Sequence, residues 1–141
     1  MYYCSMYSFK TKVRVRYGET DQMGFVYYGV YAQYFEVGRV ELLRSLEVSY
    51  KSLEEEGYFL PVVNFEIQYK KPALYDDELM IKTTIKEMPS ARIAFYYETL
   101  NMGNELLNTA KVELVFIDKS TKKPCLPPDI ITDKLKEKIQ N

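Results

Sequence analysis

Hydrophobic and polar residues alternate with period two near the start of the chain, over residues 8–17 (SFKTKVRVRY). Val13 and Val15 share one parity, while lysine and arginine occupy the other. This alternation predicts a half-buried β-strand. A polar stretch with several glycines follows, over residues 18–29. Because glycine lets the backbone bend and approach a ligand closely, we expect a loop there.

The next segment, residues 30–46, has apolar residues at helical spacing and predicts one long helix. Its apolar stripe is broad, so we expect this helix to be buried over much of its surface. Gly38 inside it costs about 1 kcal/mol relative to alanine, and close packing against a strand or a partner helix would account for it. Ser49 is placed to cap a second, short helix over residues 50–56, which Gly57 would end.

After the second helix the pattern changes to strands. The runs that predict four strands are 59–71, 78–88, 92–100 and 106–118. In the first of them the apolar residues alternate as Val63, Phe65, Ile67 and Tyr69. Because successive strands joined by short turns pair antiparallel, we expect these four to pair in the order of the chain.

The predicted elements together define an α+β fold class. An antiparallel sheet of about five strands must cover its apolar face, and one long helix is available to do so. The 141 residues are expected to form a single domain, 1–141, with a core at about 8–126 and a C-terminal tail at 127–141. Charged and apolar residues in this tail predict a short amphipathic helix over residues 129–140.

The composition excludes several classes of function. Lys plus Arg number 19 and Asp plus Glu 20, and this net charge of −1 gives no general attraction to nucleic acid. The chain has no His, which excludes a Ser-His-Asp triad, a Cys-His pair and a histidine-bearing metal site built within it.

Cysteine usage and hydropathy bear on localisation. Cys4 and Cys125 show neither metal-ligand spacing nor a CxxC motif, which indicates reduced thiols and a cytoplasmic protein. The N-terminus lacks the pattern of a signal peptide. No apolar run approaches the roughly 18 residues of a membrane span.

Candidate chemistry is concentrated in residues 16–44, RYGETDQMGFVYYGVYAQYFEVGRVELLR. Asp21 lies in the loop just before the long helix, whose N-terminus offers free N–H groups to a negative oxygen. The ordinary interpretation of Asp21 is a turn former or a helix cap. Glu19 is interpreted as fixing the loop or pairing with a nearby arginine. Glu36, on the helix, is an alternative catalytic carboxylate, and its ordinary interpretation is an ion pair with Arg39.

This stretch resembles the signature of hotdog-fold acyl-CoA thioesterases of the 4-hydroxybenzoyl-CoA thioesterase type, including the relatives found beside the Tol-Pal system. The resemblance continues through LPVV, YKKPALYDDEL and VFIDKSTKKP, and so covers roughly residues 10–125. It implies a hotdog fold, in which the antiparallel sheet wraps around the long helix. It also implies hydrolysis of an acyl-CoA thioester without a metal or other cofactor. The enzyme would be a homodimer or homotetramer with its active site between protomers.

The aspartate of the family's TDxxG segment falls on Asp21, so the resemblance implies that Asp21 attacks the thioester or deprotonates the attacking water. Backbone N–H groups around Tyr28, Gly29 and Val30 would stabilise the oxyanion, and Tyr31 would flank the substrate. Many relatives have His where this chain has Tyr28, and Asn where it has Val30. Tyrosine cannot shuttle a proton near neutral pH as histidine does. The implied mechanism therefore relies on Asp21 and on main-chain donors.

Three basic residues are candidates for contacts with the phosphates of CoA. Lys70 and Lys71 lie at the end of a long predicted strand, and Arg92 follows the turn at 89–91. A solvated strand end explains the two lysines equally well.

Two other functions are compatible with the fold class. A non-catalytic acyl-CoA or acyl-carrier binding protein would bind CoA esters without turnover, and the residues at Tyr28 and Val30 motivate this alternative. A hotdog dehydratase is disfavoured, because dehydratases of this fold generally rely on a His.

Overall fold

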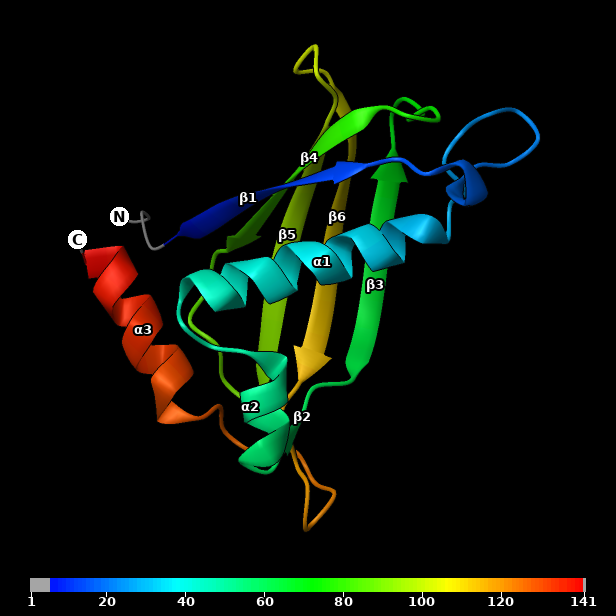
Figure 1. The fold of residues 1–141 in the computed structure, drawn as a ribbon. Coiled ribbons are helices and arrows are strands. Elements are labelled where there is room, and N and C mark those ends of the chain that lie inside the picture. Colours follow the sequence, from blue (N-terminus) through cyan, green and yellow to red (C-terminus); the bar gives the residue numbers. More distant parts are fainter. Residues whose placement is uncertain (1–5, 141) are drawn as a thin grey trace.

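One long helix lies across the face of a twisted antiparallel sheet (Figure 1). This computed structural model describes residues 6–140. The strands are β1 (Tyr7–Arg14), β2 (Tyr58–Phe59), β3 (Val62–Tyr69), β4 (Glu78–Ile85), β5 (Arg92–Leu100), β6 (Leu106–Val115) and β7 (Ile117–Asp118). The helices are α1 (Val30–Ser45), α2 (Tyr50–Glu55) and α3 (Asp129–Gln140), with a 3-10 turn, η1, at Tyr17–Glu19. None of these helices has the length and apolarity needed to cross a membrane.

The main sheet has the order β1-β4-β5-β6-β3, and β2 and β7 form a separate two-stranded ribbon. All its strand pairs are antiparallel. The α+β fold class, with about five antiparallel strands around one long helix, is confirmed.

The prediction that successive strands pair is wrong for β3 and β4, which are not neighbours in the sheet. β4 pairs with β5 and β5 with β6, but β3 pairs with β6 at one edge, and β4 pairs with β1 near the other. The crossover at residues 70–77 carries the chain between these two positions. It hydrogen-bonds along its length to the loop before α1 and to the end of β1, through Val26 N–H to Ala73 O (2.9 Å) and Asp76 N–H to Val15 O (3.1 Å).

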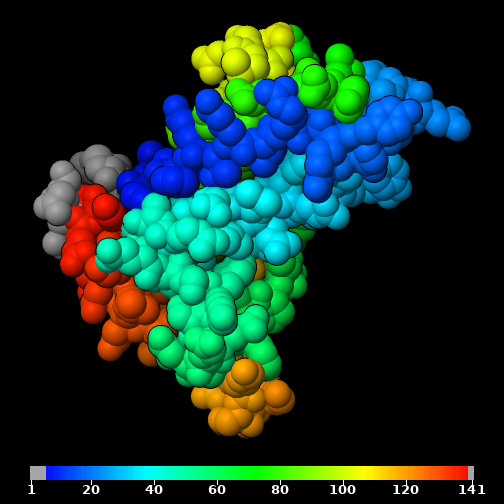
Figure 2. Space-filling view, viewed as in Figure 1, coloured from blue at the N-terminus to red at the C-terminus, as the bar shows by residue number. Residues whose placement is uncertain are grey.

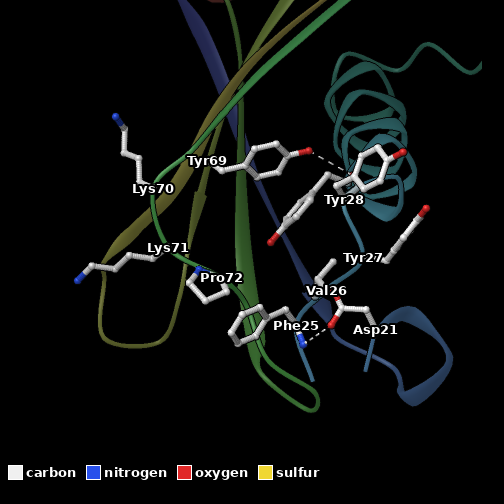
Figure 3. A pocket seen from close by; sticks show the side chains of 10 residues that line it. Asp21, Phe25, Val26, Tyr27, Tyr28, Tyr69, Lys70, Lys71 and Pro72 are labelled. Carbon is white, nitrogen blue, oxygen red and sulfur yellow. Dashed lines mark hydrogen bonds between the residues drawn. The ribbon is translucent and has the colours of Figure 1, made fainter. Parts of the chain in front are cut away.

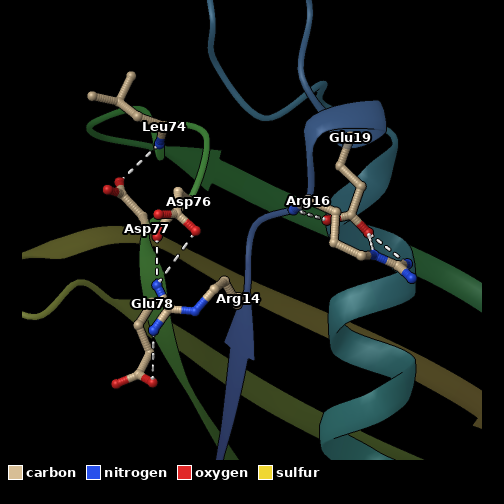
Figure 4. Close-up of polar contacts among 7 residues, drawn as sticks. All are labelled: Arg14, Arg16, Glu19, Leu74, Asp76, Asp77 and Glu78. Carbon is tan, nitrogen blue, oxygen red and sulfur yellow. Dashed lines mark hydrogen bonds and ion pairs between the residues drawn. The ribbon is translucent and has the colours of Figure 1, made fainter.

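Side chains strengthen the attachment of the crossover to β1 (Figure 4). The Arg14 guanidinium donates to the Asp76 carbonyl at 2.7 Å and to the Glu78 carboxylate at 3.3 Å. The Asp77 carboxylate accepts from the Leu74 N–H at 2.9 Å. The two contacts of Arg14 join residues 62 and 64 positions apart, so the spacing of residues along the chain could not predict them.

α1 packs closely on β4 and β5 because Gly38 has no side chain. A Cβ placed on Gly38 would lie 2.5 Å from Thr83 Oγ1 and 3.1 Å from Ile81 Cγ2. The Phe35 ring stacks on the Tyr97 ring at 4.4 Å between centroids. The prediction that Gly38 permits close packing against a strand is confirmed.

The smaller elements also agree with the sequence. Ser49 caps α2, since its hydroxyl accepts from the Ser52 N–H at 3.1 Å. α3 lies against the core through Ile131 and Leu135, both fully buried. Cys125 is a free thiol, whereas Cys4 lies outside the described residues.

Candidate functional site

The loop before α1 folds into a tight turn around the Asp21 carboxylate (Figure 3). Asp21 Oδ1 accepts hydrogen bonds from the backbone N–H groups of Met23 (2.9 Å) and Phe25 (3.2 Å). Gly24 supplies the positive φ, +78°, that closes the turn. Among the described residues, no group donates a hydrogen bond to Asp21 Oδ2. One carboxylate oxygen is thus held in place and the other is available.

The base of this turn is fixed by a second carboxylate, that of Glu19, which is only 8% exposed. It accepts from the Arg16 backbone N–H (2.8 Å), from the Arg16 guanidinium (2.8 and 2.9 Å) and from the Tyr34 hydroxyl (2.7 Å). Figure 4 shows the Arg16 contacts. The prediction that Glu19 fixes the loop and pairs with an arginine is confirmed.

The electrostatics of Glu19 follow from these contacts. Burial raises the pKa of its carboxyl, but the hydrogen bonds from Arg16 and Tyr34 outweigh burial and hold the pKa below its usual value. Glu19 therefore stays charged and binds the end of β1, the loop and α1 together.

The N-terminus of α1 lies beside the Asp21 turn. Neither the Tyr28 N–H nor the Gly29 N–H donates a hydrogen bond within the described residues, so both can serve a bound oxyanion. The Val30 N–H instead donates to the Tyr27 carbonyl at 2.9 Å. Of the three backbone donors predicted from the sequence, Val30 is therefore already engaged, and two remain.

A pocket of about 390 Å³ lies where this loop, the start of α1, the end of β3 and the crossover meet. Half of its lining residues are aromatic, and Figure 3 shows two lysines that follow β3 at one side of it, with their side chains directed away from the aromatic rings. The lining residues are Asp21, Phe25, Val26, Tyr27, Tyr28, Tyr31, Tyr69, Lys70, Lys71 and Pro72. The structure thus brings together five residues singled out from the sequence, namely Asp21, Tyr28, Tyr31, Lys70 and Lys71.

The tyrosines of the pocket differ in environment. Tyr28 is 65% exposed, whereas Tyr31 is 2% exposed. Burial raises the pKa of Tyr31 to about 12, so its hydroxyl stays protonated across the physiological range. Tyr69 was missed as a site residue, although it is the last apolar residue before Lys70. Its hydroxyl lies 3.5 Å from the Tyr28 carbonyl.

Two residues predicted as site candidates lie elsewhere. Glu36 is exposed on α1 and does not line the pocket. Its expected ion pair with Arg39 is wrong: no salt bridge joins them, and Arg39 Nε donates to the Tyr50 hydroxyl at 2.9 Å. Arg39 turns inward with the buried face of α1, whereas Glu36 points to solvent.

Arg92 lies at the opposite end of the sheet from Lys70 and Lys71. It begins β5 and is paired with Val115, while β3 reaches the pocket at the end where Tyr69 pairs with Asn108. Within one protomer Arg92 therefore lies far from Lys70 and Lys71, because the antiparallel strands place them at opposite ends of the sheet.

The chain matches known proteins over most of its length. Residues 15–135 match the family model described as the thioesterase-like superfamily. The chain is 36% identical to the acyl-CoA thioester hydrolase YbgC of Escherichia coli O157:H7 over 126 residues, which cover 89% of this chain and 94% of that protein.

A second relative and a solved structure agree with this match. The chain is 36% identical to the acyl-CoA thioesterase YbgC of Haemophilus influenzae over 121 residues, 85% of this chain and 88% of that protein. Among solved structures, the DHNA-CoA thioesterase of Staphylococcus aureus superposes with a TM-score of 0.86 at 33% identity, covering 94% of this chain and 91% of the other.

Proposed function

The chain belongs to the thioesterase-like superfamily, and we propose that it hydrolyses acyl-CoA thioesters in the pocket formed by Asp21 and the N-terminus of α1. One observation carries the proposal. Two backbone N–H groups hold one oxygen of the Asp21 carboxylate while the other oxygen is free, beside an aromatic pocket. A fixed carboxylate with one free oxygen suits either nucleophilic attack or general-base catalysis.

Both routes use the same atoms of the protein. As a base, Asp21 Oδ2 takes a proton from water, and the hydroxide oxygen bonds to the thioester carbon. As a nucleophile, Oδ2 bonds to that carbon itself and gives a mixed anhydride that water then hydrolyses. In both, the carbonyl electron pair moves to oxygen, where the N–H groups of Tyr28 and Gly29 stabilise the charge. When the tetrahedral adduct collapses, the C–S bond breaks and CoA leaves as the thiolate.

The lysines at the rim of the pocket suit the anionic part of the substrate. Lys70 and Lys71 line the same pocket as Asp21, and they would meet the phosphates of a substrate whose thioester lies beside that carboxylate. Lys71 also pairs with Glu105 at 2.5 Å. Phosphate binding by Lys71 would therefore compete with this exposed pair, which is worth little in water. Among the described residues no such competition arises for Lys70, which is therefore the simpler contact for a phosphate.

The edges of the sheet support a homodimer formed through β3. The outward positions of β1 carry Lys10, Lys12 and Arg14, which oppose edge-to-edge pairing. β3 instead leaves Val63 46% and Phe65 39% exposed. Two copies of β3 paired antiparallel about a twofold axis would extend the sheet across both protomers and cover these side chains.

This dimer gives Arg92 a role. Antiparallel pairing of β3 with its copy places the Val62 end of one strand beside the Tyr69 end of the other. Arg92 of the partner subunit is then brought towards the end of the sheet that carries Lys70 and Lys71. The pocket would lie at the boundary between protomers, as the family resemblance implies, and the CoA phosphates could meet basic residues from both.

The test follows release of the CoA thiol over short, medium, long and aromatic acyl-CoAs. We expect turnover by the native protein that is lost in Asp21→Asn. Binding of the esters without turnover of any of them would contradict the proposal and would favour a non-catalytic acyl-CoA binding protein.

A further inference from the structure

Tyr34 of α1 is a buried tyrosine whose hydroxyl makes its polar contact outside the pocket. Its side chain is 4% exposed and does not line the pocket. The hydroxyl donates to Glu19 Oε1 at 2.7 Å, and the contact is buried. Burial and the neighbouring charge of Glu19 raise the pKa of Tyr34, so the hydroxyl stays protonated and remains a donor. A phenylalanine would fill nearly the same space in the core, so packing alone does not account for the hydroxyl.

Glu19 begins a short closed loop that contains the Asp21 carboxylate. The Tyr27 N–H donates to the Glu19 carbonyl at 2.9 Å, and the Asp21 N–H donates to the Phe25 carbonyl at 2.8 Å. These two hydrogen bonds close residues 19–27 into a small antiparallel ladder. Because Asp21 is part of this ladder, whatever holds the ladder in place also holds its carboxylate.

The ladder is attached to α1 through a single side-chain contact. The free N–H donors for an oxyanion lie between the ladder and the helix, at residues 28 and 29. Among the side-chain hydrogen bonds of the described residues, only that between Tyr34 and Glu19 joins the loop at 17–29 to α1. This bond therefore holds the ladder, and Asp21 with it, against the body of the helix. A misplacement of about 1 Å in a reacting geometry can reduce the rate about 100-fold.

We propose that Tyr34 is a positioning residue for thioester hydrolysis. Its hydroxyl acts through Glu19 and keeps the Asp21 carboxylate aligned with the N–H donors at residues 28 and 29. The carboxylate then faces the thioester carbon while the carbonyl oxygen meets the donors. This inference rests on the proposed function, since it requires Asp21 to be the reacting carboxylate.

The experiment measures kcat and KM separately for Tyr34→Phe, with the acyl-CoA that the native protein hydrolyses fastest. We expect kcat to fall about 10-fold or more, because the carboxylate is less well aligned, and KM to stay within about 3-fold, because the pocket lining is intact. The matched control is Tyr7→Phe. The Tyr7 hydroxyl bonds to Ser45 Oγ at 2.6 Å, at the other end of α1, so this variant also removes one tyrosine hydrogen bond to the helix. It should keep the native kcat.

The same substitution in the Asp21→Asn protein separates positioning from a general structural defect. Tyr34→Phe should cause no further loss of the residual kcat there, because Tyr34 acts through Asp21. A structural defect would reduce activity in both backgrounds. If Tyr34→Phe does not fold, Glu19→Asp is the second variant, since it keeps the charge but withdraws the carboxylate from Tyr34 by one methylene. It should show the same loss of kcat.

Native kcat in a folded Tyr34→Phe or Glu19→Asp protein would overturn the inference, as would an equal loss in Tyr7→Phe. A further loss on adding Tyr34→Phe to Asp21→Asn would also contradict it. Failure of the proposed function has a different signature, because Asp21→Asn alone would then keep its activity.

Discussion

Two carboxylates, two residues apart, have opposite environments in this protein. Glu19 is buried and accepts hydrogen bonds from Arg16 and Tyr34 at both oxygens. Asp21 lines the pocket and has one oxygen free. A carboxylate that is fully hydrogen-bonded stabilises structure, whereas one that keeps a free oxygen can react. The hydrogen bonds, more than the residue type, separate the two roles.

Glu19→Gln should lower the free energy of unfolding by about 2 kcal/mol at pH 7, because it replaces charge-assisted hydrogen bonds by neutral ones. The folded-state pKa of Glu19 is lowered. Its contribution is therefore complete above the pKa of the unfolded state, about 4.3, and is lost as the pH falls through the folded-state pKa. Urea unfolding from pH 7 to pH 3 measures this. A difference between native and variant protein that does not shrink below pH 4 would contradict the assignment.

At the scale of elements, the contact of α1 with the sheet depends on Gly38. Gly38→Ala should destabilise the protein by about 1–2 kcal/mol, since overpacking outweighs the gain of about 1 kcal/mol in helix propensity. Thermal unfolding tests this, with Gly18→Ala as the control because a Cβ there meets nothing within 4 Å. Equal melting temperatures for the two variants would show that the helix can move away from β4.

The sequence predicted the positions of the helices and strands better than it predicted which strands pair. α1 was expected over 30–46 and occupies Val30–Ser45, because its apolar stripe is a local property. The strand expected at 92–100 matches β5, whereas the one expected at 59–71 divides into β2 and β3. The position of β4 beside β1 was not predicted, because it depends on contacts such as that of Arg14 with Asp76.

The sequence predicted those residues of the site that belong to one short, continuous motif. Asp21, Tyr28 and Tyr31 lie in one continuous stretch, and the structure places all three in the pocket. Tyr69 comes from the sheet, and only the fold brings it against Tyr31 near the start of α1. Glu36 and Arg39 have the spacing of a helical ion pair, but burial of Arg39 against Tyr50 separates them.

At the scale of the whole molecule, the pocket lies beside β3, an edge strand of the sheet. In the space-filling view the loop at residues 17–29 projects at the upper right and the turn at 119–123 projects at the bottom (Figure 2). A twofold axis beside β3 would place the loop of one copy near the turn of the other. The dimer would then enclose the pocket.

Val63→Lys should weaken this dimer, because it places a charge on the exposed apolar side of β3. Light scattering coupled to gel filtration would show a shift towards monomer, and thioesterase activity per chain should fall with it. Lys10→Glu, on the opposite edge strand, is the control and should leave the oligomer intact. A Val63→Lys protein that stays dimeric and active would rule out β3 as the interface.

The most direct test of the central claim is kcat/KM for the best acyl-CoA in Asp21→Asn and in Asp76→Asn. Both variants remove one carboxylate charge, but Asp76 lies on the crossover outside the pocket, and asparagine tolerates its positive φ of 68°. We predict a loss of at least about 100-fold for Asp21→Asn, equivalent to about 3 kcal/mol of transition-state stabilisation, and near-native activity for Asp76→Asn. A folded Asp21→Asn protein that keeps its activity within a few fold would contradict the account.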